Sequence, residues 1–353
     1  MTAPTGDAAG LPDTMRRVFV RAADDVAVES VPRPEPGPGE LLLRTTVVGI
    51  CGSDTHAAHG RHPFIALPYA PGHEVVGRVA AVGAGVTGPA PGDRVVVEPN
   101  LACGSCRPCR EGRYNICERL EVFGCQTEGG LADFCVVPAD RVHLLPDGLD
   151  DDTAALIEPF ATPIRAVRGA GDLTGGTVVV LGAGPIGLLV AAAARQAGAA
   201  RVVVTDVLES KRERAVKLGA TAALDARAPD LVEQALAALG GPADAVFDCV
   251  SRESSMASAI DLVRKGGTVV VLGVAAGPVP VRLDLIQDRE IVVRGSLMFV
   301  GDDFRTAIDY LSRGVVTPAD LVTAVVGLDE AQRAYTLSDD PEHVKVLVRV
   351  AAG

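Results

Sequence analysis

The sequence has little basic charge, no recognisable secretion signal and no low-complexity tract. Its 353 residues carry 33 Lys and Arg against 45 Asp and Glu, a formal net charge of -12. This balance repels phosphate backbones and anionic lipid, so it argues against nucleic-acid partners. The opening MTAPTGDAAGLPDTMRR lacks the basic start and apolar core of a signal peptide. We therefore expect a cytoplasmic protein in which residues 1–14 form a disordered lead-in.

The sequence also lacks a convincing membrane span. Residues 177–194, TVVVLGAGPIGLLVAAAA, carry no charge and approach the length of a transmembrane helix. The glycines and the proline inside this stretch instead predict a buried strand, a tight turn and the start of a helix. We expect no membrane association.

Two sequence textures divide the chain, whose length favours two domains. Residues 17–142 alternate short apolar runs with Gly and Pro, which predicts a barrel-like β domain with few helices. From about residue 150, valine runs alternate with alanine-rich helical stretches, which indicates a doubly wound parallel sheet. We expect an α/β plus β protein, with residues 15–160 and 296–353 in the β domain and residues 161–295 in the parallel-sheet domain.

A dinucleotide-binding motif follows the first strand of the parallel-sheet domain. The segment GAGPIG lies directly after TVVVL and opens a helix, the context that Gly-x-Gly-x-x-Gly requires. Its glycines allow a tight turn and close approach of a pyrophosphate to the helix N-terminus. Asp206 ends the next strand, where an acid binds the ribose hydroxyls and favours NAD over NADP. The predicted cofactor residues are Gly182, Gly184, Pro185, Ile186, Gly187, Asp206 and Lys211, the last equally explained by a solvated helix face.

Four of the eight cysteines lie within residues 103–117. The spacing Cys-x2-Cys-x2-Cys-x7-Cys supplies four thiolates that can surround one tetrahedral zinc ion. A zinc ion with four protein ligands has no open position, so we expect it to order a loop and not to catalyse. An iron–sulfur cluster is the alternative for four cysteines. The predicted ligands are Cys103, Cys106, Cys109 and Cys117.

A second set of candidate metal ligands is spread along the chain in GICGSD, GHE and IEP. It offers one sulfur, one nitrogen and several oxygen donors, the mixed set of a catalytic zinc that must leave room for water or an alcohol. Taken singly, each residue also has an ordinary structural explanation, such as a core thiol or a surface charge. The candidates are Cys51, His73, Glu74 and Glu158.

The order of these motifs resembles the zinc-dependent medium-chain alcohol dehydrogenase family, and within it the sorbitol, threonine and butanediol dehydrogenase branch. The resemblance runs through GICGSDTH, PGHEVVGRVAAVG, PGDRVVVEPN, the four-cysteine segment, LIEPFAT and the glycine motif, and it covers nearly the whole chain from Met15. It implies a GroES-like catalytic domain, a Rossmann NAD-binding domain, and one catalytic and one structural zinc ion per chain. Family members are usually homodimers or homotetramers.

The resemblance assigns the metal ligands. Cys51 and His73 match the two ligands of the catalytic zinc, and Glu74 and Glu158 match two carboxylates, of which one ligates while the other stays behind it or exchanges. The clustered cysteines match the structural zinc. At the catalytic site we expect zinc to act as a Lewis acid that favours ionisation of an alcohol.

Further roles follow from the same resemblance. Ser53 matches the hydroxyl that takes the alcohol's proton, His56 the histidine that passes it to solvent, and Thr162 a residue against the nicotinamide. Sorbitol dehydrogenases carry an arginine and a tyrosine after the last sheet strand, where they contact the polyol. This chain has Met298 and Phe299 there, which disfavours sorbitol and resembles the butanediol pattern.

The predicted activity is NAD-dependent oxidation of a secondary alcohol, such as a diol, polyol, sugar or amino-alcohol, to the ketone, or the reverse. Reduction of a conjugated C=C or C=O bond by a medium-chain reductase is the alternative reaction. A non-catalytic binding protein on the same scaffold is a third possibility, but such a protein is expected to lose the metal ligands, and here all are present.

The remaining histidines and cysteines receive smaller roles. We expect His59 and His62 to be solvated loop residues and not metal ligands. Family members place the strand of Cys125 beside the substrate pocket, whereas Cys135 and Cys249 are typical of core thiols.

Overall fold

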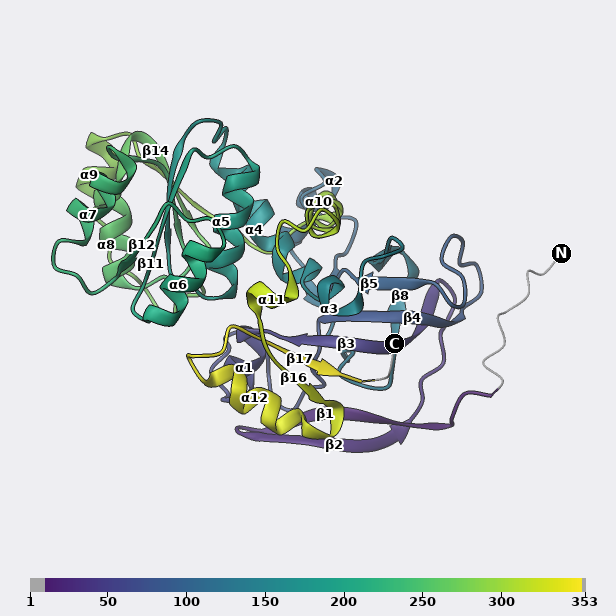
Figure 1. The fold of residues 1–353 in the computed structure, drawn as a ribbon. Helices are drawn as coiled ribbons and strands as arrows, with labels where there is room; N and C mark the ends of the chain where they lie inside the picture. Colours follow the sequence, from purple (N-terminus) through teal and green to yellow (C-terminus); the bar gives the residue numbers. More distant parts are fainter. Residues whose placement is uncertain (1–9, 351–353) are drawn as a thin grey trace. The chain divides into compact units, whose positions relative to one another are not determined.

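The computed structural model describes residues 10–350, and the chain divides into two compact units, Met1–Pro159 with Val300–Gly353 and Phe160–Phe299 (Figure 1). We call these unit 1 and unit 2. The first strand begins at Thr14, so most of the predicted lead-in lies outside the described residues. Among the described residues, no helix combines the length and apolar character needed to cross a bilayer.

Unit 2 contains a parallel sheet of six strands in the order β12-β11-β10-β13-β14-β15. This is the order of a doubly wound dinucleotide-binding sheet, and the chain reverses direction across the sheet between β10 and β13. The valines of β10 and β11 are fully buried, because both faces of such a sheet are covered. The strands are β10 (Thr177–Leu181), β11 (Arg201–Asp206), β12 (Ala222–Asp225), β13 (Ala243–Asp248), β14 (Val263–Val271) and β15 (Val292–Gly295).

Helices cover both faces of this sheet, with α5 on one side and α7 and α8 on the other (Figure 1). The alanine-rich α5 is buried from Gly187 to Ala194. The predicted strand, turn and helix between residues 177 and 194 are confirmed. The helices are α4 (Ile157–Ala170), which begins in unit 1, α5 (Pro185–Gln196), α6 (Glu209–Lys217), α7 (Leu231–Leu239), α8 (Glu253–Leu262) and α9 (Leu283–Asp288).

Unit 1 is built on a sheet of seven strands in the order β16-β17-β3-β4-β5-β9, with β8 also paired to β3. The strand β17 lies between β16 and β3, so a segment near the C-terminus forms an interior strand of the sheet. The fold class, α/β plus β, is as predicted. The strands are β3 (Glu40–Ile50), β4 (Glu74–Val82), β5 (Arg94–Val97), β8 (Phe134–Pro138), β9 (Val142–Leu144), β16 (Val322–Gly327) and β17 (Lys345–Arg349).

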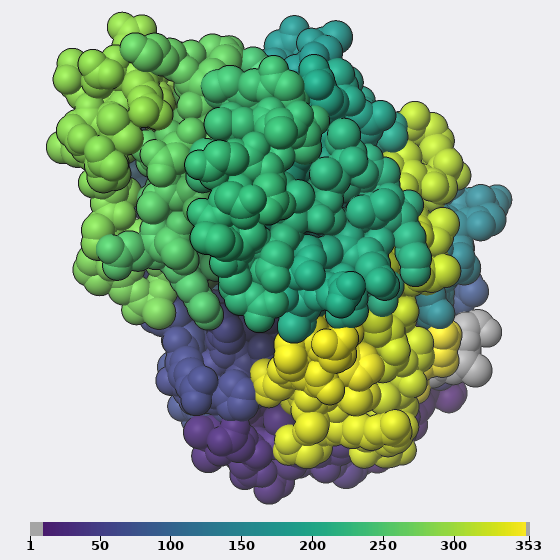
Figure 2. Space-filling view, turned by 60° about the vertical axis from the view of Figure 1, so that its left-hand side comes forward, coloured from purple at the N-terminus to yellow at the C-terminus, as the bar shows by residue number. Residues whose placement is uncertain are grey.

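Two smaller sheets, six α-helices and three short 3-10 helices complete the regular structure in the described part of unit 1. The core joins β3, β4, β17 and α12 through Val48, Val75, Val346 and Ala334. Figure 2 shows the N-terminal and C-terminal segments, purple and yellow, meeting on the surface of this unit, where the Val26 backbone N–H donates to Gln332 at 3.1 Å. The remaining elements are β1 (Thr14–Ala22), β2 (Asp25–Pro32), β6 (Asn100–Leu101), β7 (Glu121–Val122), α1 (Gly52–Ala58), α2 (Arg107–Arg110), α3 (Asp151–Ala154), α10 (Gly301–Ser312), α11 (Pro318–Leu321) and α12 (Ala331–Asp339).

Candidate metal and cofactor sites

The four clustered cysteines converge in unit 1 around the short helix α2. Their sulfur atoms all lie within 4.8 Å of one another, with Cys106 Sγ 3.3 Å from Cys109 Sγ and 3.8 Å from Cys117 Sγ. All eight cysteines of the chain are free thiols. Four sulfurs at this mutual distance fit the ligand set of one tetrahedral zinc ion. We call residues 103–117 the cysteine lobe.

The backbone of the cysteine lobe favours thiolates. The N–H groups of Cys103 and Arg119 donate to Cys117 Sγ at 3.3 Å, and the Cys106 N–H donates to Cys103 Sγ at 3.4 Å. Hydrogen bonds from the Ser105 backbone and from Arg119 lower the pKa of Cys103 to about 4. The thiolate is the form of cysteine that binds a metal. The hydrogen bonds within this short segment therefore favour metal binding by the cysteine lobe.

Three of the four predicted catalytic-site ligands also come together. Donor atoms of Cys51, His73 and Glu74 lie within 4.8 Å of one another. Cys51 immediately precedes α1, His73 immediately precedes β4, and Glu74 is the first residue of β4. Antiparallel pairing places Glu74 opposite Gly49 of β3, where an added Cβ would lie 1.8 Å from the Glu74 carboxylate. Glycine at position 49 therefore allows the carboxylate to reach the site.

Glu158 lies outside this compact group. It occupies the first turn of α4 and is 7% exposed. Burial raises the pKa of its carboxyl to about 8, against the opposing attraction of His73 and with a smaller contribution from Glu74. Glu158 is thus an electrostatic neighbour of the three clustered donors.

Asp54 lies next to the candidate metal donors and is not among the residues predicted from the sequence. It is 1% exposed, accepts a hydrogen bond from the Cys51 N–H at 3.0 Å, and directs Oδ1 to within 3.5 Å of His73 Nδ1. Burial disfavours the charged imidazole, but Asp54 and nearby thiols outweigh burial and raise the pKa of His73 well above its usual value. A carboxylate behind a ligand histidine fixes its ring orientation and tautomer. The GSD sequence after Cys51 was the available signal.

Lys345 is the second residue that the sequence analysis missed. It is 3% exposed on β17, and its Nζ lies 2.6 Å from both Glu74 carboxylate oxygens and 3.1 Å from the Ile50 carbonyl. Burial lowers the pKa of Lys345, but the Glu74 carboxylate raises it, and the net shift is upward. Lysine is almost never buried without a partner, so its position in the apolar run VKVLVRV could have identified it.

Helix α1 carries the two predicted proton-transfer residues. Ser53 is half-buried and His56 is exposed, and their spacing of three residues places them on one face of the helix. His59, at the end of α1, contacts Asp24 at 2.5 Å and Asp339 at 2.8 Å. Its two ring nitrogens are thus engaged by carboxylates, and it is absent from the donor groups formed by the described residues.

Cys125 lies beside the metal site in unit 1. Its Sγ is 3.8 Å from His73 Nδ1, and the residue is half-buried. Cys135 is buried against the Thr45 hydroxyl at 3.9 Å. His62 is half-buried, and burial lowers the pKa of its imidazole.

The glycine motif of unit 2 forms the turn between β10 and α5. Gly182 has φ +95° and donates its N–H to the Thr205 carbonyl at 2.8 Å. Gly187 packs so closely that an added Cβ would lie 1.8 Å from the Gly182 carbonyl, whereas a Cβ added at Gly184 would meet nothing within 4 Å. The backbone at Gly184 is therefore open to a ligand, and it begins the helix α5.

Asp206 ends β11 next to this turn. Its two carboxylate oxygens accept the Ala183 N–H at 2.8 Å and the Leu208 N–H at 2.9 Å, which fixes the side chain beside the glycine turn. Arg212 of α6 donates to the Asp206 carbonyl at 3.0 Å, a contact that the sequence analysis did not anticipate.

The other predicted residues of unit 2 have simpler placements. Pro185 and Ile186 are half-buried in the first turn of α5, Lys211 is half-buried in α6, and Thr162 lies one turn after Glu158 in α4.

Comparisons with known proteins agree with this arrangement of sites. Residues 37–147 match the alcohol dehydrogenase GroES-like domain, and residues 185–313 match the zinc-binding dehydrogenase family. Sorbitol dehydrogenase of Bacillus subtilis (strain 168) is 33% identical over 346 residues, covering 96% of this chain and 98% of that protein. The chain belongs to the zinc-binding dehydrogenase family.

Other members of the zinc-binding dehydrogenase family extend the comparison. L-galactonate-5-dehydrogenase of Escherichia coli (strain K12) is 37% identical over 292 residues, covering 82% of this chain and 85% of that protein. The crystal structure of 2R,3R-butanediol dehydrogenase from Bacillus subtilis superimposes with a TM-score of 0.89 at 29% identity, covering 96% of this chain and 100% of that one. The predicted family and the GroES-like plus Rossmann fold are confirmed.

Proposed function

We propose that this zinc-binding dehydrogenase transfers a hydride between a secondary alcohol of the diol, polyol or sugar class and NAD, giving the ketone. One observation carries the proposal: a thiol, an imidazole and a carboxylate from two separate segments of the chain lie within 4.8 Å of one another. Three protein ligands leave a fourth position for water or an alcohol, which is the arrangement of catalytic zinc. When bound, zinc supplies Lewis acidity that favours loss of the hydroxyl proton.

The residues of α1 would carry that proton away. Ser53 is half-buried one residue before Asp54, and His56 on the same helix face is exposed to solvent. A hydroxyl near the metal donors followed by an exposed imidazole forms a route for a proton to leave the site. Ser53→Ala should lower turnover while leaving the zinc content unchanged, and an unchanged rate would remove Ser53 from this route.

Glu158 and the ion-paired Glu74 are the two proposed carboxylates of the site. Lys345 pairs directly with both oxygens of Glu74 at 2.6 Å, whereas His73 and Lys345 act on Glu158 only through charge attraction, which opposes the effect of burial on its pKa. This difference supports Glu158 as a carboxylate that can exchange with Glu74 at the metal. The cysteine lobe, with Cys103, Cys106, Cys109 and Cys117, would hold the structural zinc.

NAD is the proposed cofactor. It would lie against Gly182, Gly184 and Gly187, with Asp206 at the adenosine ribose and Thr162 at the nicotinamide. Related structures include both an alcohol dehydrogenase from Escherichia coli complexed with NADH and a zinc-binding dehydrogenase from Sinorhizobium meliloti 1021 bound to NADP. The carboxylate of Asp206, fixed by two backbone N–H groups, supports NAD because it repels a 2′-phosphate.

The substrate class rests on the relatives and on one departure from them. The relatives are named for sorbitol, L-galactonate and butanediol, which favours an alcohol substrate over the conjugated C=C bond of the reductase alternative. Phe299 is fully buried and Met298 is half-buried with φ +45°, so this segment lacks the polar side chains expected for sorbitol. We therefore favour a short diol or another secondary alcohol over sorbitol.

A homodimer or homotetramer is the proposed assembly. β15 is the outer strand of the unit 2 sheet, and its Val292 and Val293 are 51% and 39% exposed. An apolar edge strand with unpaired backbone groups favours pairing with a second copy.

The free thiols of all eight cysteines support a reducing, cytoplasmic location.

One experiment tests the proposed function directly. Zinc is counted in the purified protein, and NADH absorbance is then followed with a panel of diols, polyols, sugars and hydroxy acids. Two zinc ions per chain with NAD-linked turnover of a secondary alcohol is the expected result. Turnover of an enone with NADH, and of no alcohol, would instead establish the reductase reaction.

A further inference from the structure

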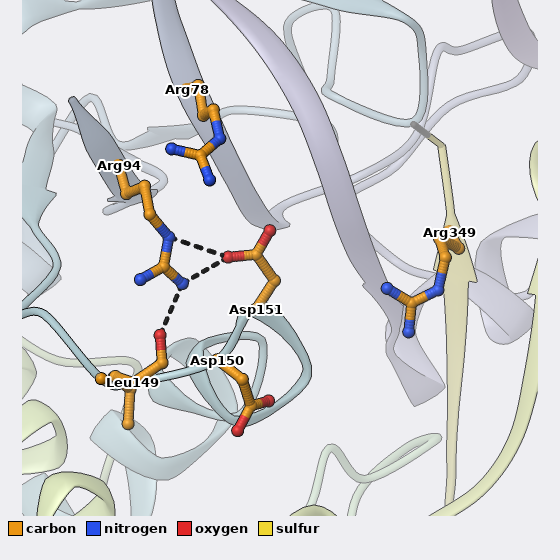
Figure 3. Close-up of a pocket in the computed structure, with 7 residues that line it drawn as sticks. Arg78, Arg94, Leu149, Asp150, Asp151 and Arg349 are labelled. Carbon is orange, nitrogen blue, oxygen red and sulfur yellow. Dashed lines mark hydrogen bonds and ion pairs between the residues drawn. The ribbon is translucent and has the colours of Figure 1, made fainter. Parts of the chain in front are cut away.

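A pocket lined by arginines lies in unit 1, away from the metal site. It has a volume of about 410 Å³, and its lining includes Arg78, Arg94 and Arg349 together with the chain around Leu149 (Figure 3). Arg78 lies four residues beyond Glu74 on β4, about 13 Å along the strand at the usual rise per residue. The pocket is thus separate from the Cys51, His73 and Glu74 donors.

The arginines are brought together by strand register. Arg78 of β4 lies directly opposite Arg44 of β3 on one side and Arg94 of β5 on the other. Three like charges therefore form a row across three neighbouring strands. Like charges directly opposite each other on paired strands are destabilising, so this row favours any group that neutralises it.

Neighbouring residues already engage most of these arginines, but not Arg78. Arg94 donates from Nε to Asp151 at 3.1 Å and also contacts the Leu149 carbonyl, as Figure 3 shows. Arg349 contacts both oxygens of Asp152 at 2.8 Å, and the Arg44 guanidinium lies over the Phe134 ring at 4.9 Å.

Arg78 differs from its neighbours. Its half-buried guanidinium has no hydrogen bond or ion pair to any residue in the described part of the chain, and it points into the pocket beside Arg94 (Figure 3). The pocket lining contains two carboxylates. Asp151 pairs with Arg94, and Asp150 accepts hydrogen bonds from the Thr153 N–H at 2.8 Å and from the Thr153 hydroxyl at 2.7 Å. Arg78 is thus the cation of the pocket that lacks a counter-ion.

Donor groups of the other two arginines are also available. Arg94 makes its contacts through Nε and Nη2, and Arg349 through Nη2, so Nη1 of each carries no hydrogen bond to a described residue. Planar guanidinium groups match the geometry of phosphate and carboxylate oxygens, and arginine is the usual residue for such recognition.

We propose that this pocket binds a phosphate-type oxyanion, held mainly by Arg78 with Arg94 and Arg349 as secondary partners. The anion would neutralise the row of like charges across β3, β4 and β5 and would link these strands to β17. This inference does not depend on the proposed dehydrogenase activity, because none of the three arginines belongs to the metal or cofactor site.

The test measures binding of inorganic phosphate by isothermal titration calorimetry on the zinc-loaded protein, with NADH present to fill the dinucleotide site. Ionic strength is held constant with chloride. We expect saturable binding by the wild type and at least about a tenfold weaker affinity for Arg78→Gln, the usual order of a lost hydrogen bond to a charged group. Arg349→Gln, at an exposed position, is the second variant and should weaken binding to a smaller degree.

The matched control is Arg333→Gln, which removes an exposed arginine that pairs with Glu330 in another part of unit 1. It should bind phosphate as the wild type does. A parallel titration with glucose 6-phosphate distinguishes the source: tighter binding than inorganic phosphate identifies a phosphorylated metabolite, and equal binding identifies free phosphate. The proposal is overturned if the wild type shows no saturable binding, or if Arg78→Gln and Arg349→Gln both retain wild-type affinity.

Discussion

The cysteine lobe and the Cys51 site are both groups of metal donors, but they are built in opposite ways. The lobe takes four sulfurs and their supporting N–H donors from residues 103–119. The Cys51 site takes its donors from the end of β3 and the start of β4, and its support from Asp54 on α1 and Lys345 on β17. A closed set of ligands can be local in sequence, whereas the open set depends on the complete fold of unit 1.

This contrast explains what each metal can do. Four thiolates complete a tetrahedral coordination sphere and leave no position for a substrate. The mixed donors at Cys51, His73 and Glu74 leave a position open, and the buried charges of Asp54 and Lys345 keep them oriented. The predictions below separate the two sites by their effects on turnover, stability and zinc content.

The largest expected effect follows loss of the Cys51 thiol. Cys51→Ser should reduce turnover by at least about a thousandfold, because Lewis-acid stabilisation worth several kcal/mol is lost. Zinc content should fall from two ions per chain to one, with little change in the thermal midpoint. Cys135→Ser, at a buried thiol outside both donor groups, is the matched control and should keep both zinc ions. Turnover retained by Cys51→Ser would exclude this site as the catalytic one.

Loss of a lobe cysteine should give the opposite pattern. Cys106→Ser also reduces zinc from two ions to one, but its main effect should be a lower thermal midpoint. Structural zinc contributes apparent free energies of about 10–16 kcal/mol in zinc-finger peptides, so a loss of several kcal/mol is expected here. Differential scanning calorimetry and turnover per folded molecule are the measurements. An unchanged midpoint would show that the lobe does not depend on its metal.

Lys345→Met tests whether Lys345 stabilises the Cys51 site. It removes the cation from a pair in which both residues are almost fully buried, and breaking such a pair typically costs about 3–5 kcal/mol. Urea unfolding should show this loss, while the lobe should keep its zinc. The double variant Lys345→Met with Glu74→Gln should recover much of the stability, since no uncompensated charge is left. A single variant as stable as the wild type would mean that Glu74 needs no counter-ion.

The smallest expected effect on stability concerns His59. This residue lies at the end of α1, close to the Cys51 site, but is predicted to bind no metal. The hydrogen bond with Asp24 is the largest cause of a raised pKa of His59, and Asp339 raises this pKa further. Partial burial lowers the pKa, but the net shift is upward. A raised pKa stabilises the protein below the unfolded value of about 6.5, and this contribution is lost as pH rises through the folded value. Asp339→Asn should therefore be less stable than the wild type at pH 6, with the difference shrinking above neutral pH.

Thermal midpoints from about pH 5.5 to about pH 9 provide the measurement, a range from roughly one unit below to roughly 2.5 units above the ordinary histidine pKa. Asp309→Asn, which loses an exposed ion pair with Arg313 on α10, is the control and should show no such trend. A change in zinc content on Asp339→Asn would contradict the assignment of His59 as a non-ligand.

Much of the fold could be read from local sequence. Valine runs alternating with alanine-rich stretches predicted the parallel sheet, because each strand and helix shows its own burial pattern. The donors Cys51, His73 and Glu74 could be proposed from residue chemistry and from the resemblance to a family. The glycines at 182, 184 and 187 were likewise evident from one short motif.

Residues whose role depends on distant pairing could not be read in this way. Lys345 is 271 residues from Glu74 in the sequence, and only the pairing of β17 with β3 brings them together. The row formed by Arg44, Arg78 and Arg94 depends on the register of three strands. A one-residue slip in any of them would move its side chains to the other face.

The position of β17 also bears on the order in which the protein is made. Unit 2 comes from one continuous stretch of chain, whereas the sheet of unit 1 lacks β16 and β17 until the C-terminal segment is synthesised. At about 5–20 residues per second, the 271 residues between Glu74 and Lys345 take roughly 14 to 54 seconds to translate. During that interval the newly made Glu74 has no lysine partner and the edge of β3 is open, whereas unit 2 ends at Phe299 and is synthesised in full before β17.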